Sequence, residues 1–290
     1  MSYIQGVAGQ RRFAQAVVAE VVRRDRTLQP RFNRADFSVE WGNPPARLFL
    51  ENTYWEWLDA PEREKALAIE ALVDLAFRRE ITLSWDQAAP RLLPAVRNRR
   101  LLLADPTTSG AVDPMAGAAF IDVVGDLAAV PAVAERASVT LLNHRALRNW
   151  GVDPRDAMAR AIDNLRAVSP SRFERDADGF YVSRYDDQFD AARILLPEIF
   201  QNLPLSGPPI AIVVSRRCVV CAGAADDQGL FRMAGYVERL MQREARPISC
   251  RPILLNSGKW WPLNPEAPQI GIFNRLLSIQ ADIDRMIDSY

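Results

Sequence analysis

The chain has 290 residues with 36 basic and 36 acidic side chains, a formal net charge of +0, one histidine and three cysteines. Apolar residues at 49% and charged residues at 25% are typical of a globular protein and exclude wholesale disorder. The neutral total argues against nucleic-acid binding by bulk electrostatics, but all basic residues except Lys65 and Lys259 are arginine, which grips carboxylate and phosphate groups well.

Targeting signals are not evident in the sequence. Arginines interrupt the apolar positions of the first twenty residues, so we expect no secretory signal, and no stretch of ~18 apolar residues predicts a membrane span. Three cysteines are too few, and odd in number, for a disulfide framework. We therefore expect a cytoplasmic protein.

Residues 1–88 form a predicted N-terminal, helix-rich region. Apolar residues spaced by three and four predict an amphipathic helix from Ile4 to Asp25. Alternation over Asp36 to Trp41 predicts a short strand, and a further helix is expected from Pro61 to Arg79.

Residues 89–265 form the predicted core, in which short strands alternate with helices. The expected strands are Leu92–Val96, Phe120–Val130 and Ser138–Leu142, followed by hairpins over Phe173–Tyr185, Ile210–Ala222 and Ile248–Leu263. The expected helices start at an Asp153 cap, at Gln188 (running to Leu203) and at Gln228. This order predicts an α+β fold, with helices packed over a mixed or largely antiparallel sheet. Residues 266–290 predict a final amphipathic helix, so that amphipathic helices flank the core on both sides.

Thiol and imidazole chemistry have weak support. Cys218 and Cys221 match C-x-x-C but lie in a predicted strand, where side chains three apart point to opposite faces. Zinc would need two further ligands, and only Cys250 and His144 are left, so we predict no metal and no cofactor. His144 stands where a strand gives way to a helix, which favours a role as a cap over catalysis.

The segment YDDQFDAAR concentrates carboxylates. Asp187 and Asp190 are candidates for Mg²⁺ ligands, or Asp190 for a general base. The competing interpretation makes Asp187 the N-cap of a helix, with Asp190 at its third position paired to Arg193. The capping interpretation needs no additional partner and is preferred.

Arginines gather where predicted strands end. Arg97, Arg99 and Arg100 follow one strand directly, and Arg216 lies in the turn of a later hairpin. These side chains are candidates for holding an anionic group, although a solvated charged loop explains them as well. Trp260 and Trp261 are candidate partner contacts, because tryptophan and arginine often dominate interface energies.

The order of several short motifs is similar to that of the YtpQ-like bacterial family. The resemblance covers about residues 90–265 and depends most on Asp187-Gln188-Phe189-Asp190-Ala191-Ala192-Arg193-Ile194-Leu195, which follows D-x-[YF]-D-A-[AS]-R-I-L. Leu93-Pro94-Ala95-Val96-Arg97 and the segment Pro247-Ile248-Ser249 also match, whereas Gln188-Phe189 replaces the usual Gly-Tyr. The resemblance implies a cytoplasmic protein and no established activity, so it transfers no catalytic residue.

Two functions of different class follow. The first is a binding or regulatory protein that recognises a protein partner or an anionic ligand through its arginine-rich loops and exposed tryptophans. The alternative is a metal-dependent hydrolase or transferase that uses Asp187 and Asp190, with Arg97 or Arg193 stabilising charge. The visible residues form no complete catalytic set, which favours the first.

Overall fold

The computed structural model of the chain describes residues 3–34, 37–42, 46–50, 53–54, 57–58, 60–77, 83–104, 108–109, 114–134, 139–185, 187–242, 244 and 247–288. Helices and antiparallel sheets are combined in it, which confirms the predicted α+β class. The described residues form two compact units, one within residues 3–77 and the other within 83–288. No helix among these residues combines the length and the apolar character that crossing a membrane requires.

The first unit packs two helices against a small sheet. Its elements are α1 (Tyr3–Arg24), β1 (Arg31–Asn33), β2 (Ser38–Trp41), β3 (Ala46–Phe49) and α3 (Glu62–Phe77), and the strands pair in the order β1-β2-β3. Helix α1 buries Phe13, Val17 and Val21 on one face, as its spacing requires. These residues share a core with Trp41 and Tyr54.

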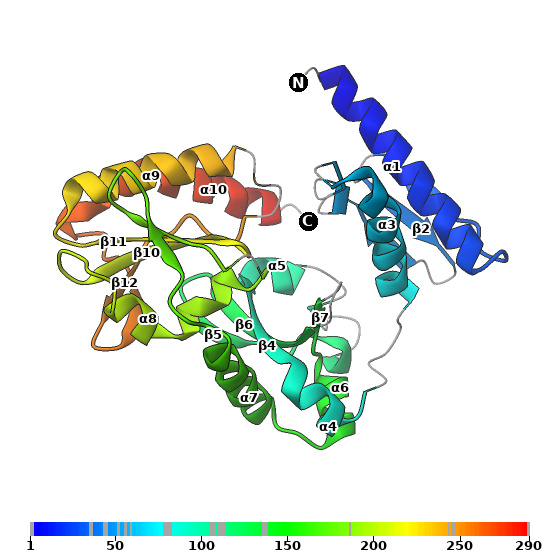
Figure 1. Cartoon of the computed structure of the whole chain (residues 1–290), viewed down its shortest axis with the longest axis horizontal. Coiled ribbons are helices and arrows are strands. Elements are labelled where there is room, and N and C mark those ends of the chain that lie inside the picture. Colours follow the sequence, from blue (N-terminus) through cyan, green and yellow to red (C-terminus); the bar gives the residue numbers. More distant parts are fainter. Residues whose placement is uncertain are drawn as a thin grey trace. The chain divides into compact units, whose positions relative to one another are not determined.

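The second unit contains two further sheets and most of the helices (Figure 1). Its first half runs through α4 (Trp85–Ala88), η1 (Ala89–Arg91), β4 (Leu92–Asn98), α5 (Arg99–Ala104), η2 (Pro114–Ala116), β5 (Ile121–Val124), β6 (Leu127–Ala134), β7 (Val139–Leu141), α6 (His144–Trp150) and α7 (Pro154–Ala167). Its second half runs through β8 (Phe173–Arg175), β9 (Tyr181–Ser183), η3 (Asp190–Leu195), α8 (Pro197–Gln201), β10 (Pro209–Ser215), β11 (Cys218–Gly223), α9 (Asp227–Met241), β12 (Ile253–Asn256), β13 (Lys259–Pro262), η4 (Pro268–Phe273) and α10 (Asn274–Asp288).

Every described strand pairing in this unit is antiparallel. Six strands follow the order β13-β12-β10-β11-β9-β8, and β6 lies between β4 and β5 while also pairing with β7. One face of the six-stranded sheet meets α7, η3 and the smaller sheet in one apolar core. The opposite face packs against α9, η4 and α10 in a second core, and Figure 1 shows these two helices lying along the sheet.

Local sequence signals place most hairpins and one helix start correctly. Asp153 caps α7 by accepting the backbone N–H of Arg155, as predicted. The hairpins β8–β9, β10–β11 and β12–β13 also form where turn residues interrupt the alternating segments.

Two predicted elements are different in the structure. The single strand predicted over Phe120–Val130 is the hairpin β5–β6, which turns at Gly125 and Asp126, and Gly125 has φ +58°. The helix predicted from Gln188 to Leu203 is a 3₁₀ helix, η3, followed by the short α8, because Pro197 lacks the N–H that a continuous helix needs at that point.

Candidate functional site

The YDDQFDAAR segment builds a buried polar cluster around Arg193, which we call the η3 cluster (Ser169, Ser183, Tyr185, Asp187, Asp190 and Arg193). The Arg193 side chain is 0% exposed and donates to both oxygens of Asp187, at 2.7 and 2.6 Å. Its Nε donates to the Ser169 hydroxyl at 3.0 Å, and its guanidinium carbon lies 4.0 Å from the centroid of the Tyr185 ring. The cation is therefore paired and enclosed.

Asp190 occupies a different part of the η3 cluster. Its Oδ1 accepts the backbone N–H of Tyr185 at 3.1 Å, while its buried Oδ2 has no hydrogen-bond partner. Burial raises the pKa of the Asp190 carboxyl above its ordinary range, and hydrogen bonds from the Ser183 hydroxyl and the Tyr185 backbone oppose that rise. Burial likewise raises the pKa of Tyr185.

This geometry corrects the sequence interpretation of the segment. Asp187 is not the cap of a helix: Phe189 occupies that position, and Asp187 instead accepts the Phe189 backbone N–H at 2.9 Å in a local turn. Arg193 pairs with Asp187 and not with Asp190. The structure thus brings the three predicted residues together, but in a pairing that spacing along a regular helix does not predict, because the segment is not an α-helix.

A second polar cluster ties the C-terminal helix to the rest of the unit; we call it the α10 cluster (Arg100, Asp126, Ser249, Arg251, Asp284 and Asp288). Asp284 accepts from Arg251 at 2.5 Å and lies 3.3 Å from Arg100, which also pairs with Asp288. The Ser249 hydroxyl donates to the Asp126 carboxylate at 2.9 Å. Burial raises the pKa of Asp126, while Ser249 and Arg251 lower it.

The arginine-rich loops are therefore only partly available to a ligand. Arg100 is paired with two carboxylates of α10, and Arg97 donates to the backbone oxygen of Val96 at 2.8 Å. Arg99 lies 3.6 Å from Asp122, and Arg216, which is half-buried, also has an interaction partner.

The two candidate tryptophans face opposite ways. Trp260 is half-buried: its indole N–H donates to the Ile194 oxygen at 2.8 Å, and its ring meets Phe200 edge-on at 5.0 Å. Trp261, the next residue, is 56% exposed. Only Trp261 is presented to a partner.

The thiols point away from one another, as the strand prediction requires. Cys221 lies in the core between the sheets, whereas Cys218 packs against the core under α9. Burial raises the pKa of Cys218 and of Cys250 to about 12, so these thiols are poor nucleophiles at neutral pH. Within the described residues, no group of three or more His, Cys, Asp and Glu side chains is arranged to hold a metal ion.

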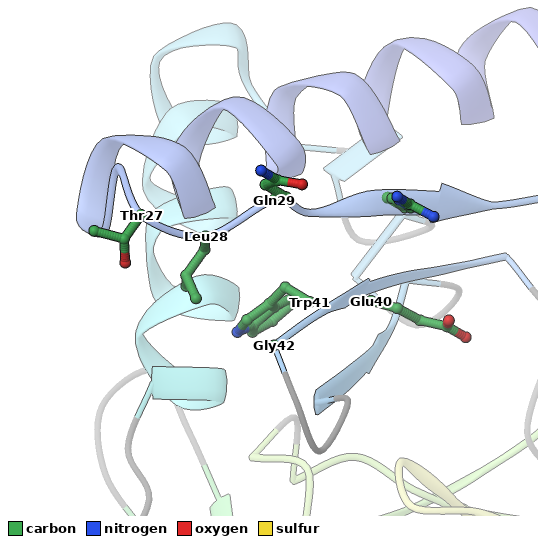
Figure 2. A pocket seen from close by; sticks show the side chains of 7 residues that line it. Thr27, Leu28, Gln29, Glu40, Trp41 and Gly42 are labelled. Atoms are coloured by element: carbon green, nitrogen blue, oxygen red, sulfur yellow. The ribbon is translucent and has the colours of Figure 1, made fainter.

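A hollow of about 400 Å³ opens in the first unit (Figure 2). The loop after α1 contributes Thr27, Leu28 and Gln29, while β2 contributes Glu40 and the indole of Trp41. Arg31 of β1 also lines it, and the register pairs Arg31 with Glu40 across the two strands. Its basic and acidic groups are thus adjacent, so the hollow has no net charge of its own.

A hollow of about 440 Å³ lies in the second unit where α6 meets the start of α7. His144 and Arg148 line it together with the apolar side chains of Leu147 and Val152. Sequence reasoning considered His144 alone and missed Arg148. The spacing of four residues on one predicted helix was the signal available, since it places both side chains on one face.

Comparison of the chain with protein-family models, with curated proteins and with solved structures finds no match. The similarity to the YtpQ-like family therefore stays a prediction, and the two clusters, the hairpin and the two hollows have to be interpreted from their own geometry.

Proposed function

We propose that this protein is a binding protein that recognises a protein partner through the β12–β13 hairpin, with Trp261 as the central contact. The observation that carries the proposal is that consecutive tryptophans divide their roles: Trp260 holds the hairpin from inside and Trp261 is 56% exposed. An aromatic side chain held on a rigid strand loses little conformational entropy on binding, which is why such residues often dominate interfaces.

The turn of the hairpin supports a rigid presentation. Ser257 and Gly258 both have positive φ, +49° and +75°, as a two-residue turn of this kind requires, and Asn256 pairs directly with Lys259. Trp260 then fixes the second strand against Phe200 and Ile194. The display of Trp261 therefore does not depend on binding.

Lys259 indicates the chemistry of the partner. It is exposed, lies two residues before Trp261 and so projects from the same face of β13. No described side chain pairs with Lys259. A partner that places a carboxylate beside an apolar group would satisfy both residues.

The metal-dependent hydrolase or transferase has less support. Both oxygens of Asp187 already accept from the Arg193 guanidinium, and Asp190 is only 1% exposed. A metal ion at Asp187 would have to displace an enclosed cation that has no other carboxylate partner among its printed contacts.

The test compares two exposed aromatic residues. Proteins captured from a lysate of the source cell by the immobilised full chain would be identified and their affinities for the purified variants measured. We expect Trp261→Ala to weaken the captured partner about 30-fold or more, the size of an interface hot spot. Phe231→Ala, which removes a ring that is 71% exposed on α9, is the matched control and should leave affinity unchanged.

Lys259→Gln should lower the affinity less than Trp261→Ala does, and it should also reduce the dependence of binding on salt. Equal affinity of wild type, Trp261→Ala and Lys259→Gln for every captured protein would contradict the proposal. Urea unfolding of Trp261→Ala should change by less than about 0.5 kcal/mol, which separates loss of contact from loss of fold.

A further inference from the structure

The hollow beside α6 combines two nitrogen-bearing side chains with an apolar lining. His144 and Arg148 lie one turn apart on α6, are both exposed and both line the same space of about 440 Å³. Leu147, which is 1% exposed, Val152 and Met115 give it apolar surface.

Neither nitrogen-bearing side chain is used inside the protein. Within the described part of the chain, the side chains of His144 and Arg148 have no hydrogen bond and no ion pair. Arg100 and Arg193 are different, because carboxylates of the chain itself neutralise them. The guanidinium of Arg148 thus keeps its donors for an external acceptor.

The neighbouring charges leave the hollow basic when the imidazole is protonated. Asp153, at the start of α7, is the one acidic residue of its lining, and its Oδ1 accepts the backbone N–H of Arg155. The 3₁₀ turn η2 contributes Met115 and no charge. The first-unit hollow differs, since Glu40 there lies opposite Arg31.

We propose that the hollow beside α6 binds a small ligand that joins an oxyanion group, carboxylate or phosphate, to an apolar body. Arg148 holds the oxyanion with its planar fork of donors, protonated His144 supplies a second charged donor, and Leu147 and Val152 contact the apolar part. Imidazoles generally lose their proton near pH 6.5, so the site binds more strongly at pH 6 than at pH 8.

The unique histidine makes the test direct. In the full chain without added histidines, all imidazole ring-proton signals belong to His144. We expect phenyl phosphate and phenylacetate to shift these signals saturably at pH 6. Inorganic phosphate and acetate, which lack the apolar body, should bind several-fold more weakly, and comparing the two head groups shows which oxyanion is preferred.

Variants then separate the two roles. Arg148→Gln should weaken phenyl phosphate at pH 6 about tenfold or more, since it removes a charge-assisted contact. His144→Gln, followed by calorimetry, should bind weakly and with the same affinity at pH 6 and pH 8. Arg31→Gln, in the other hollow, is the matched control and should bind as wild type does.

Both side chains are exposed, so we expect these variants to keep their fold, which far-ultraviolet circular dichroism checks. The proposal is overturned if none of the four probes shifts the His144 signals saturably up to ~10 mM, an affinity too weak to organise a site. Shifts that are equally large in Arg148→Gln would also overturn it.

Discussion

The η3 cluster and the α10 cluster are made from the same chemistry and differ in how water reaches them. In the η3 cluster one arginine that is 0% exposed meets one aspartate, while in the α10 cluster Arg100 and Arg251, both partly exposed, share three aspartates. Enclosed charges interact strongly, and leaving one unpaired is costly. Charges near the surface are screened by water and salt.

The difference teaches that a salt bridge must be judged by what happens to the charge left behind. Arg193 has no route to water once Asp187 is removed, whereas Arg251 and Arg100 can turn to solvent. The η3 cluster should therefore be the more important of the two for stability.

The largest expected effect is that of Asp187→Asn. It removes the charge paired with an enclosed guanidinium, and we expect the free energy of unfolding to fall by about 3 kcal/mol in urea denaturation. Asp178→Asn, in the exposed β8–β9 turn, is the matched control and should change stability by less than about 0.5 kcal/mol. A loss of under about 1 kcal/mol in Asp187→Asn would show that the two clusters do not differ as argued.

A smaller effect is expected for Asp284→Asn. This change removes the carboxylate shared by Arg251, Arg100 and the Gln280 amide, and should cost about 1–2 kcal/mol at low salt. Because Arg251 and Arg100 reach solvent, the loss should shrink when unfolding is measured in 1 M sodium chloride. The loss in Asp187→Asn should change little, so equal salt dependence of the two variants would remove the distinction.

The smallest expected effect is a slope with pH. The pKa of Asp190 is raised in the folded protein, mainly by burial, so the folded state holds this proton more tightly than the unfolded chain does. Its contribution to stability is complete below pH 3.8 and is lost as the pH rises through the folded-state pKa. Asp190→Asn carries no such proton and should flatten the decrease of stability above pH 4.

Asp126 has a raised pKa for the same main reason, so part of the slope should persist in Asp190→Asn and disappear only when Asp126→Asn is added. Unfolding in urea at several pH values between 4 and 8 measures both contributions. A slope identical in wild type and in the double variant would show that neither carboxyl carries it.

Local signals were enough to predict much of the fold. Asp153 caps α7, alternating segments form the three later hairpins, and Cys218 and Cys221 point to opposite faces, because each of these features depends on neighbours within a few residues. The turn at Gly125 and Asp126 was missed because the apolar run through it looks like one continuous strand.

The polar clusters depend on contacts that sequence spacing does not encode. Asp126, Ser249 and Asp284 are far apart in the chain and meet only because α10 packs beside α5 and the end of β4. Spacing predicted a pair between Asp190 and Arg193, whereas the 3₁₀ geometry and Gln188, at φ +66°, bring Asp187 to Arg193. A glycine at residue 188, as in the similar family, would adopt that φ without strain.

The distribution of the three cysteines gives each core of the second unit its own chemical reporter. Cys221 is enclosed between the two sheets, and Cys250 is enclosed on the face that α9 and α10 cover. A thiol reagent can modify either one only when the structure around it opens, so the two modification rates measure two separate opening reactions. If α10 leaves the sheet while the inner core stays closed, Cys250 will be modified long before Cys221, and the order of labelling will reveal which part of the protein opens first.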